Sequence, residues 1–186
     1  MKISRSKWSN ILFFILLGLL IFPNTRKPIQ IAVNRIFAFS PSVNTKDERQ
    51  KINPLQYKLR GMDGSINSLP IAQGDIILLN YWATWCAPCI AEMPSLQKLY
   101  DDYADKIKFA FITNEEREVI NEFLSKKGYD FPVYLATNTR PEKLMHKSIP
   151  TTFLIDKNGT ILIKKTGAAN WNSDSVRALI DSLLSQ

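Results

Sequence analysis

The pattern of apolar and polar residues divides this chain into three segments. A continuous apolar run extends from Trp8 to Phe22. Prolines punctuate residues 23–53, and residues 44–51 are polar without periodicity. From Leu55 onward, short apolar runs alternate with longer amphipathic stretches, a pattern typical of strands and helices in turn. We therefore expect an N-terminal apolar segment over 1–22, a linker over 23–53 and one globular domain over 54–186.

The domain begins with a predicted β-hairpin, whose arms 57–59 and 65–69 flank the turn pair Asp63-Gly64. Asn158-Gly159 predicts a second tight hairpin. Further strands are predicted at 76–81, 106–112, 133–135, 149–156 and 161–165, and helices at 86–103, 115–127, 141–147 and 174–184. This order predicts an α/β fold, a three-layer sandwich in which helices flank a mixed sheet.

Both cysteines of the chain lie at one strand-to-helix junction, in Cys86-Ala87-Pro88-Cys89. A C-x-x-C pair in this context is typical of redox chemistry. The free N–H groups and the dipole of a helix N-terminus favour the thiolate of Cys86, which is the reactive form. We expect Cys86 to face solvent and Cys89, one turn deeper, to be buried and placed to attack a mixed disulfide on Cys86. The alternative is a disulfide that only stabilises the fold. Closing so short a loop removes little chain entropy, so such a bond would stabilise weakly.

Net charge adds little to this interpretation, because the formal charge of +7 is concentrated at the N-terminus. Residues 1–40 carry six basic side chains and no acidic ones, and the rest of the chain is nearly neutral. We therefore expect no nucleic-acid partner. Two cysteines and one histidine cannot complete a structural zinc site without carboxylates, and we expect neither a metal nor another cofactor.

The N-terminal segment has the basic and then apolar pattern of an export signal. As a helix, Trp8 to Phe22 spans roughly 22 Å, short of the ~30 Å membrane core, which favours a cleaved signal. No A-x-A-like cleavage site follows the run, which favours a retained anchor. We predict a single-pass anchor with a cytoplasmic N-terminus and the domain outside the cytoplasm, on the periplasmic side; secretion after cleavage is the alternative. Residues 29–39 are mostly apolar. They could lie on the membrane surface, pack on the domain or form a short strand, and the sequence does not decide among the three.

Several motifs over residues 55–186 resemble the thioredoxin superfamily. They are Trp85-Cys86-Ala87-Pro88-Cys89 after a strand, Ile149-Pro150-Thr151 before another, and then Asn158-Gly159 and Gly167-Ala168. The stretch from Asn80 to Cys89, followed by Glu92-Met93-Pro94, resembles the TlpA/ResA-type branch. That resemblance implies a thioredoxin-like fold and a membrane-tethered protein that reduces disulfides outside the cytoplasm, often in cytochrome c maturation.

The resemblance also implies site roles. It implies a cis Ile149–Pro150 bond that faces the disulfide and leaves the backbone of Ile149 free to pair with an extended substrate. It implies that Glu92, with a raised pKa, exchanges a proton with Cys89. A solvated glutamate that the helix dipole favours in the first turn is the alternative. Asn80 replaces the buried aspartate of classical thioredoxins and cannot act as a base.

The remaining aromatic and spacer residues are assigned from their neighbours along the chain. We expect Trp85, Ala87 and Pro88 to contact substrate, together with Ile149 and Pro150. Trp82 is expected in the core, and Trp171 either near the site or packed at the surface. His146 is expected on a surface helix.

These inferences predict a protein-disulfide reductase. Its partners would be a disulfide-bearing protein substrate, a transmembrane thiol carrier as electron donor, and the membrane through residues 1–22. A disulfide oxidase or isomerase, and a metal or haem chaperone on the same scaffold, are the alternatives. A peroxidase is disfavoured because the residues before Cys86 do not form the P-x-x-x-T/S-x-x-C arrangement.

Overall fold

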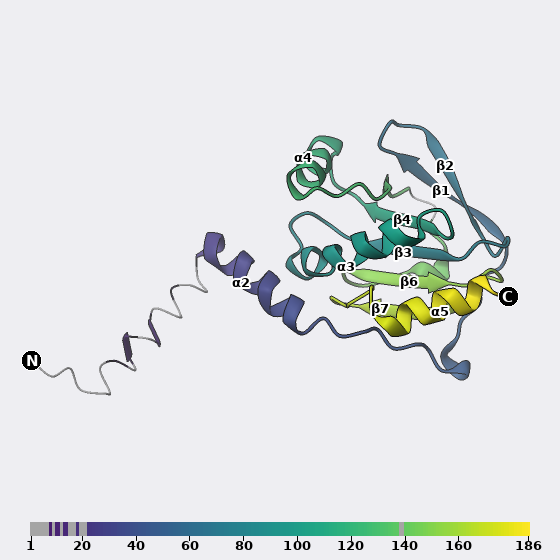
Figure 1. The fold of residues 1–186 in the computed structure, drawn as a ribbon. Coiled ribbons are helices and arrows are strands. Elements are labelled where there is room, and N and C mark those ends of the chain that lie inside the picture. The colour runs from purple at the N-terminus through teal and green to yellow at the C-terminus, as the bar shows by residue number, and fades with distance from the viewer. Residues whose placement is uncertain (1–7, 9, 12, 15–17, 19–21, 138–139) are drawn as a thin grey trace, which may run out of the picture.

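The computed structural model describes residues 8, 10, 11, 13, 14, 18, 22–137 and 140–186 (Figure 1). The predicted anchor, residues 1–22, therefore lies almost entirely outside the described residues. Within the described part, no helix combines the length and the apolar character needed to cross a membrane.

A seven-stranded mixed sheet forms the centre of the domain, in the order β2-β1-β5-β4-β3-β6-β7. The β3–β4 and β4–β5 pairs are parallel and the other pairs antiparallel. The strands are β1 Leu55–Gly61, β2 Ile66–Ile71, β3 Ile77–Tyr81, β4 Lys108–Thr113, β5 Val133–Leu135, β6 Thr151–Ile155 and β7 Ile161–Thr166. The mixed sheet and the N-terminal hairpin β1–β2 confirm the predicted fold class.

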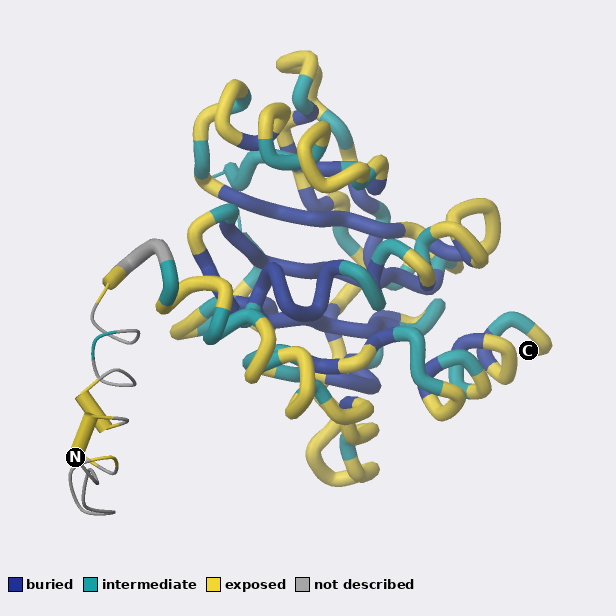
Figure 2. The backbone as a smooth tube through the Cα atoms, turned by 60° about the vertical axis from the view of Figure 1, so that its left-hand side comes forward, coloured by how far each residue is buried: buried dark blue, intermediate teal, exposed yellow. Residues whose placement is uncertain are grey.

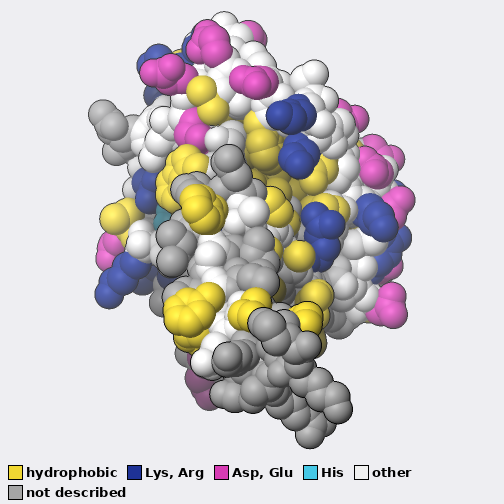
Figure 3. All heavy atoms as spheres, turned by 90° about the vertical axis from the view of Figure 1, so that its left-hand side faces the viewer, with side chains coloured by type: hydrophobic (Ala, Val, Ile, Leu, Met, Phe, Trp, Pro, Cys, Tyr) yellow, Lys and Arg dark blue, Asp and Glu magenta, His cyan; other side chains and the backbone are white. Residues whose placement is uncertain are grey.

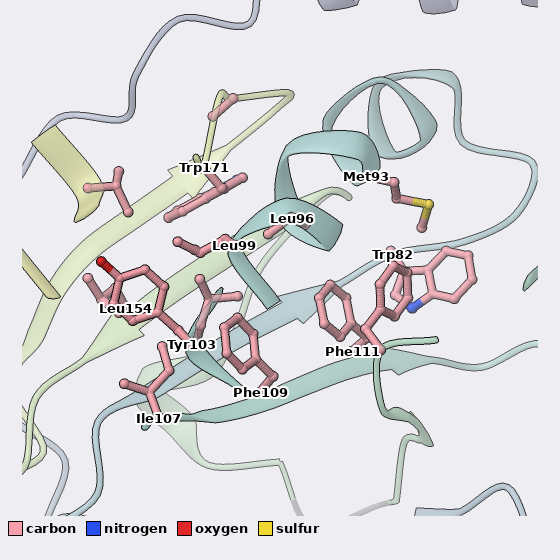
Figure 4. Packing of buried hydrophobic residues seen from close by; sticks show 14 of the residues in the cluster. Trp82, Met93, Leu96, Leu99, Tyr103, Ile107, Phe109, Phe111, Leu154 and Trp171 are labelled. Carbon is pink, nitrogen blue, oxygen red and sulfur yellow. The ribbon is translucent and has the colours of Figure 1, made fainter. Parts of the chain in front are cut away.

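Three helices pack on this sheet: α3 Ala87–Tyr103, α4 Arg117–Lys127 and α5 Asp174–Leu184. Their buried side chains join one apolar cluster with Trp82, Phe111 and Trp171 (Figure 4). A second cluster covers the opposite face of the sheet, where Ile52 and Leu144 reach it from segments outside the strands. The sheet is thus buried on both faces, and β3 and β6 are buried along their whole length (Figure 2).

Two predicted details differ from the structure. The helix expected over 141–147 is only the short 3-10 helix η2, Glu142–Leu144, because Pro141 and Met145 at its two ends are extended. His146 follows η2 and is half-buried rather than on a surface helix. Ser173 is the residue before α5, and its hydroxyl bonds Ser40 and Ser175 and does not cap the helix backbone.

The linker is docked on the domain. Residues Pro23–Ile36 form α2, which packs against α3, and a second 3-10 helix, η1, spans Lys46–Glu48 (Figure 1). The linker then follows β7 at the edge of the sheet, where the N–H of Asn44 donates to Leu162 O at 2.7 Å and the N–H of Ile161 donates to Gln50 O at 2.8 Å. The predicted linker is therefore ordered on the surface of the domain, and the boundaries of the three segments stay a prediction.

Gly159 explains part of this docking. It has a φ of +84° in the turn between β6 and β7, and a Cβ there would collide with the carbonyl oxygen of Ile52. The N–H of Ile52 donates to Gly159 O at 2.9 Å. The turn residue predicted from the Asn-Gly pair therefore also lets the linker backbone approach the sheet edge.

Candidate active site

Cys86 and Cys89 are joined by a disulfide at the mouth of α3, with their Cα atoms 5.2 Å apart. The chain reaches this point from the end of β3, and Cys86, in an extended conformation, is the N-cap of α3. Its Sγ accepts a hydrogen bond from the N–H of Cys89 at 3.3 Å. A first-turn amide is therefore directed at the sulfur that must carry the negative charge, as the predicted thiolate requires.

The expected difference in exposure between the two cysteines is wrong for the disulfide form. Cys86 is only 4% exposed and Cys89 is fully buried. Trp85, in contrast, is 66% exposed beside them. The disulfide holds Cys86 against the first turn of α3, so the indole of Trp85 is the most exposed part of the motif.

The Ile149–Pro150 peptide bond is cis, as the resemblance implies. Pro150 is buried at the start of β6, and Ile149 is partly exposed. A cavity of about 230 Å³ opens beside them, lined by Trp85 and Ile149 together with Tyr81 and Arg140. Two of the predicted substrate-contacting residues therefore share one cavity, whereas Ala87 and Pro88 lie in the first turn of α3 and do not line it.

Glu92 is buried in the second turn of α3, with 1% of its surface exposed. Oε1 accepts from Asn80 Nδ2 at 2.8 Å, and Oε2 accepts from Trp171 Nε1 at 3.0 Å and from the N–H of Ala169 at 3.2 Å. A solvated carboxylate, the alternative for this residue, is thereby excluded. Helix α3, strand β3 and the segment before α5 together build the pocket that holds it.

Burial raises the pKa of Glu92 from 4.5 to about 8, and the bonds from Trp171, Asn80 and Ala169 partly offset that rise. Desolvation penalises the charged form, and the three donors stabilise it. The result is a carboxyl group that gains and loses its proton near neutral pH, one helical turn from Cys89 in the sequence of α3.

Asn80 and Trp171 complete this pocket. Asn80 Nδ2 also donates to Thr152 Oγ1 at 2.6 Å, and its own Oδ1 is buried without a partner. Trp171 is fully buried, which settles its placement in favour of the site over surface packing. Trp82 is buried in the core as expected, although its Nε1 makes no hydrogen bond.

Sequence reasoning missed three residues around the motif. Glu115 accepts bonds from both the N–H and the hydroxyl of Thr84, at 2.6 and 2.7 Å, and so fixes the loop before Cys86. The guanidinium of Arg140 lies 4.6 Å from the ring centre of Tyr81, and the ring of His146 lies 4.1 Å from it. No local pattern marks these residues, because each contact joins segments distant in the sequence.

Metal ligands do not gather at this site or elsewhere in the described part of the chain. No three of its His, Cys, Asp and Glu side chains are placed to hold an ion together.

Comparison with known proteins gives a family and several relatives. The model of the AhpC/TSA family matches residues 53–163. Sporulation thiol-disulfide oxidoreductase A of Bacillus subtilis is 28% identical over 145 residues, covering 75% of this chain and 87% of that protein. Thiol-disulfide oxidoreductase ResA of Oceanobacillus iheyensis is 36% identical over 103 residues, covering 54% of each chain. The match thus spans about half the length of that ResA.

A solved structure gives the same fold. The crystal structure of a thiol:disulfide interchange protein DsbE from Chlorobium tepidum superimposes with a TM-score of 0.59 at 24% identity, over 73% of this chain and 98% of that one. At this identity the likeness concerns the arrangement of strands and helices alone.

Proposed function

We propose, from the premise that this chain belongs to the AhpC/TSA family and is a thiol-disulfide oxidoreductase, that it reduces disulfides in other proteins. The observation that carries the proposal is the N-cap position of Cys86 on α3. Its sulfur accepts a hydrogen bond from a backbone N–H of the helix and forms a disulfide with Cys89. This arrangement suits a nucleophile and the thiol that releases it.

The reaction starts from the dithiol form. The Cys86 thiolate attacks one sulfur of a substrate disulfide, an S–S bond to the substrate forms, and the other substrate sulfur leaves as a thiolate. The Cys89 thiolate then attacks Sγ of Cys86. This step releases the second substrate thiolate and leaves the Cys86–Cys89 disulfide. Two electrons have passed to the substrate, whose thiolates take up two protons.

Glu92 is the proposed proton carrier for Cys89. Cys89 must lose its proton before it attacks, and Asn80 cannot accept one. A buried carboxyl group with a pKa of about 8 exchanges protons readily at neutral pH. Its three hydrogen-bond donors hold the carboxyl group in place, so in this proposal the proton moves while the side chain stays fixed.

Substrate is proposed to bind across Trp85 and Ile149, with Ala87, Pro88 and Pro150 beneath it. An extended peptide would pair with the backbone of Ile149, as an added strand does. The exposed indole of Trp85 and the neighbouring cavity offer an apolar contact next to the reacting sulfurs.

The proposed location is outside the cytoplasm, on the periplasmic side of a membrane that residues 1–22 anchor. The basic residues before the apolar run support this orientation. Glutathione and thioredoxin keep thiols reduced in the cytoplasm, whereas the periplasm is oxidising. The disulfide left on Cys86 and Cys89 is therefore proposed to be reopened by a transmembrane thiol carrier. Cytochrome c maturation is the proposed process, and the resemblance to the TlpA/ResA-type branch supports it.

The reduction potential tests the direction of this reaction. Equilibration of the full chain in detergent with glutathione buffers, followed by thiol counting, should give a value near the ~−270 mV of thioredoxin. No polar side chain of the spacer Ala87-Pro88 is available to stabilise the Cys86 thiolate further. A value near the ~−120 mV of DsbA would overturn the reductase proposal in favour of an oxidase.

A further inference from the structure

One face of α2 is apolar, partly exposed at Ile29 and exposed at Val33 and Ile36. Ile29, Val33 and Ile36 follow one another at spacings of four and three residues, which places them on one side of the helix. Val33 is 47% exposed and Ile36 is 73% exposed. Phe37 and Phe39, directly after the helix, are 64% and 71% exposed. These five residues are called the α2 stripe below.

The opposite face of α2 contacts the domain. Lys27 Nζ donates to Thr84 O at 3.2 Å, and Ile31 lines a groove with Ile90 of α3 and Phe123 of α4. The domain-facing positions 27 and 31 are two residues out of phase with Ile29 and Val33, so the helical part of the α2 stripe points away from the domain. Figure 3 shows hydrophobic side chains gathered on this side of the molecule, with Lys and Arg side chains beside them.

The charges on α2 and on the neighbouring end of α4 indicate what covers the stripe. Residues 1–40 contain no acidic side chain, and Arg26, Lys27 and Arg35 lie on α2 itself. Lys126 and Lys127, at the end of α4, line the same groove as Lys27 and Arg35. An apolar stripe on one side of a helix, with basic side chains on its other side, is the pattern of a helix that lies in the headgroup region of an anionic membrane.

The chain before α2 also exposes large apolar side chains. Among its described residues, Trp8, Phe13, Phe14 and Phe22 are exposed by 62%, 62%, 66% and 66%. Phe22 is extended and Pro23 begins the helix, so α2 starts as a separate element with a direction of its own. A chain that enters the bilayer before Phe22 can therefore place α2 along the surface.

We propose that the α2 stripe rests on the surface of an anionic bilayer and holds the mouth of α3 at a fixed height above it. Lys27 contacts the carbonyl of Thr84, two residues before Cys86, and α2 packs against α3, so α2 and the redox site are held side by side. The partners reached in this way present their cysteines close to the membrane surface. The inference rests on the proposed anchoring, but it does not depend on the direction of electron transfer.

Spin-label accessibility tests the proposal. The full chain with Cys86→Ser and Cys89→Ser receives one new cysteine, Val33→Cys or Ile36→Cys, and a nitroxide label. Val119→Cys on α4 is the matched control, because Val119 is 43% exposed and Val33 47%. The labelled chains are reconstituted into vesicles of phosphatidylcholine and phosphatidylglycerol. Collision rates with oxygen, which enters lipid, and with a nickel chelate, which stays in water, are then measured.

We expect the oxygen-to-nickel ratio at positions 33 and 36 to exceed that at position 119 several-fold. Equal ratios at all three positions would place α2 in water and overturn the proposal. Low rates with both reagents at 33 and 36 would mean that protein, such as a second copy of this chain, covers the stripe, and would also overturn it. Flotation separates this failure from a failure of anchoring, because a chain that does not float with the vesicles contradicts both.

Discussion

At the scale of single residues, the unusual group is Glu92, a buried acid whose partners are all neutral donors. Asn80, Trp171 and the backbone of Ala169 stabilise the carboxylate without supplying a positive charge. Burial therefore outweighs them, and the pKa rises to about 8. The folded chain holds a proton on Glu92 between about pH 4.5 and 8 that the unfolded chain releases.

This difference predicts a pH dependence of stability. Because the folded pKa is raised, the contribution is fully present below about pH 4.5 and is lost as the pH rises through about 8. The loss amounts to a few kcal/mol, since one pKa unit corresponds to about 1.4 kcal/mol. Urea unfolding of Glu92→Gln should lack this slope, whereas Glu122→Gln, at an exposed position, should retain it. A slope that survives in Glu92→Gln would contradict the assignment.

Trp171 is predicted to lower the pKa of Glu92. Trp171→Phe removes the indole N–H that donates to Glu92 Oε2, so the carboxylate loses a stabilising bond and its pKa should rise above about 8. The midpoint of the pH-dependent stability loss should move upward. Loss of packing alone would lower stability at every pH and leave that midpoint in place. An unchanged midpoint would therefore refute the role.

Residues of the site were predictable where a local motif carries them. The C-x-x-C pair and Glu92 stand in one helix, and the resemblance supplied the cis bond before Pro150. Trp171 is 79 positions from Glu92, and Glu115 is 31 positions from Thr84. Such contacts depend on how the sheet brings distant segments together, which the spacing of residues along the chain does not express.

At the scale of elements, apolar periodicity predicted the strands and helices of the domain closely, and failed for the linker. α5 and β5 have the predicted bounds. Residues 44–51 are polar and aperiodic, and their order comes from backbone bonds to β7 and its turn, more than 100 positions away. Bonds of this kind leave no pattern in the side chains.

Docking of the linker predicts that one of its residues supports the fold. Ile52 is 3% exposed and closes the second apolar cluster. Ile52→Ala should lower the free energy of unfolding by about 2–5 kcal/mol, the usual loss for a buried isoleucine. Val43→Ala is the control within the same segment, because Val43 is 41% exposed and its truncation should have little effect. Equal, small losses in both variants would mean that the linker is not part of the folded unit.

At the scale of the whole molecule, the sheet order places the redox motif and the cis-proline side by side. β3 ends at the loop that leads to Cys86, and β6 begins directly after Pro150. The two strands are antiparallel neighbours, with Tyr81 opposite Thr151, so the end of one meets the start of the other. The fold class was predictable from the sequence, whereas the position of α2 beside this junction depended on the structure.

The central claim is that Cys86 attacks and Cys89 releases, and covalent trapping measures this most directly. Reduced Cys89→Ser and reduced Cys86→Ser are each mixed with a disulfide-bearing protein such as insulin, and the products are separated without reductant and weighed by mass spectrometry. The account predicts a stable mixed disulfide on Cys86 in the Cys89→Ser chain and little or none in the Cys86→Ser chain. Equal trapping by the two variants, or none by either, would contradict it.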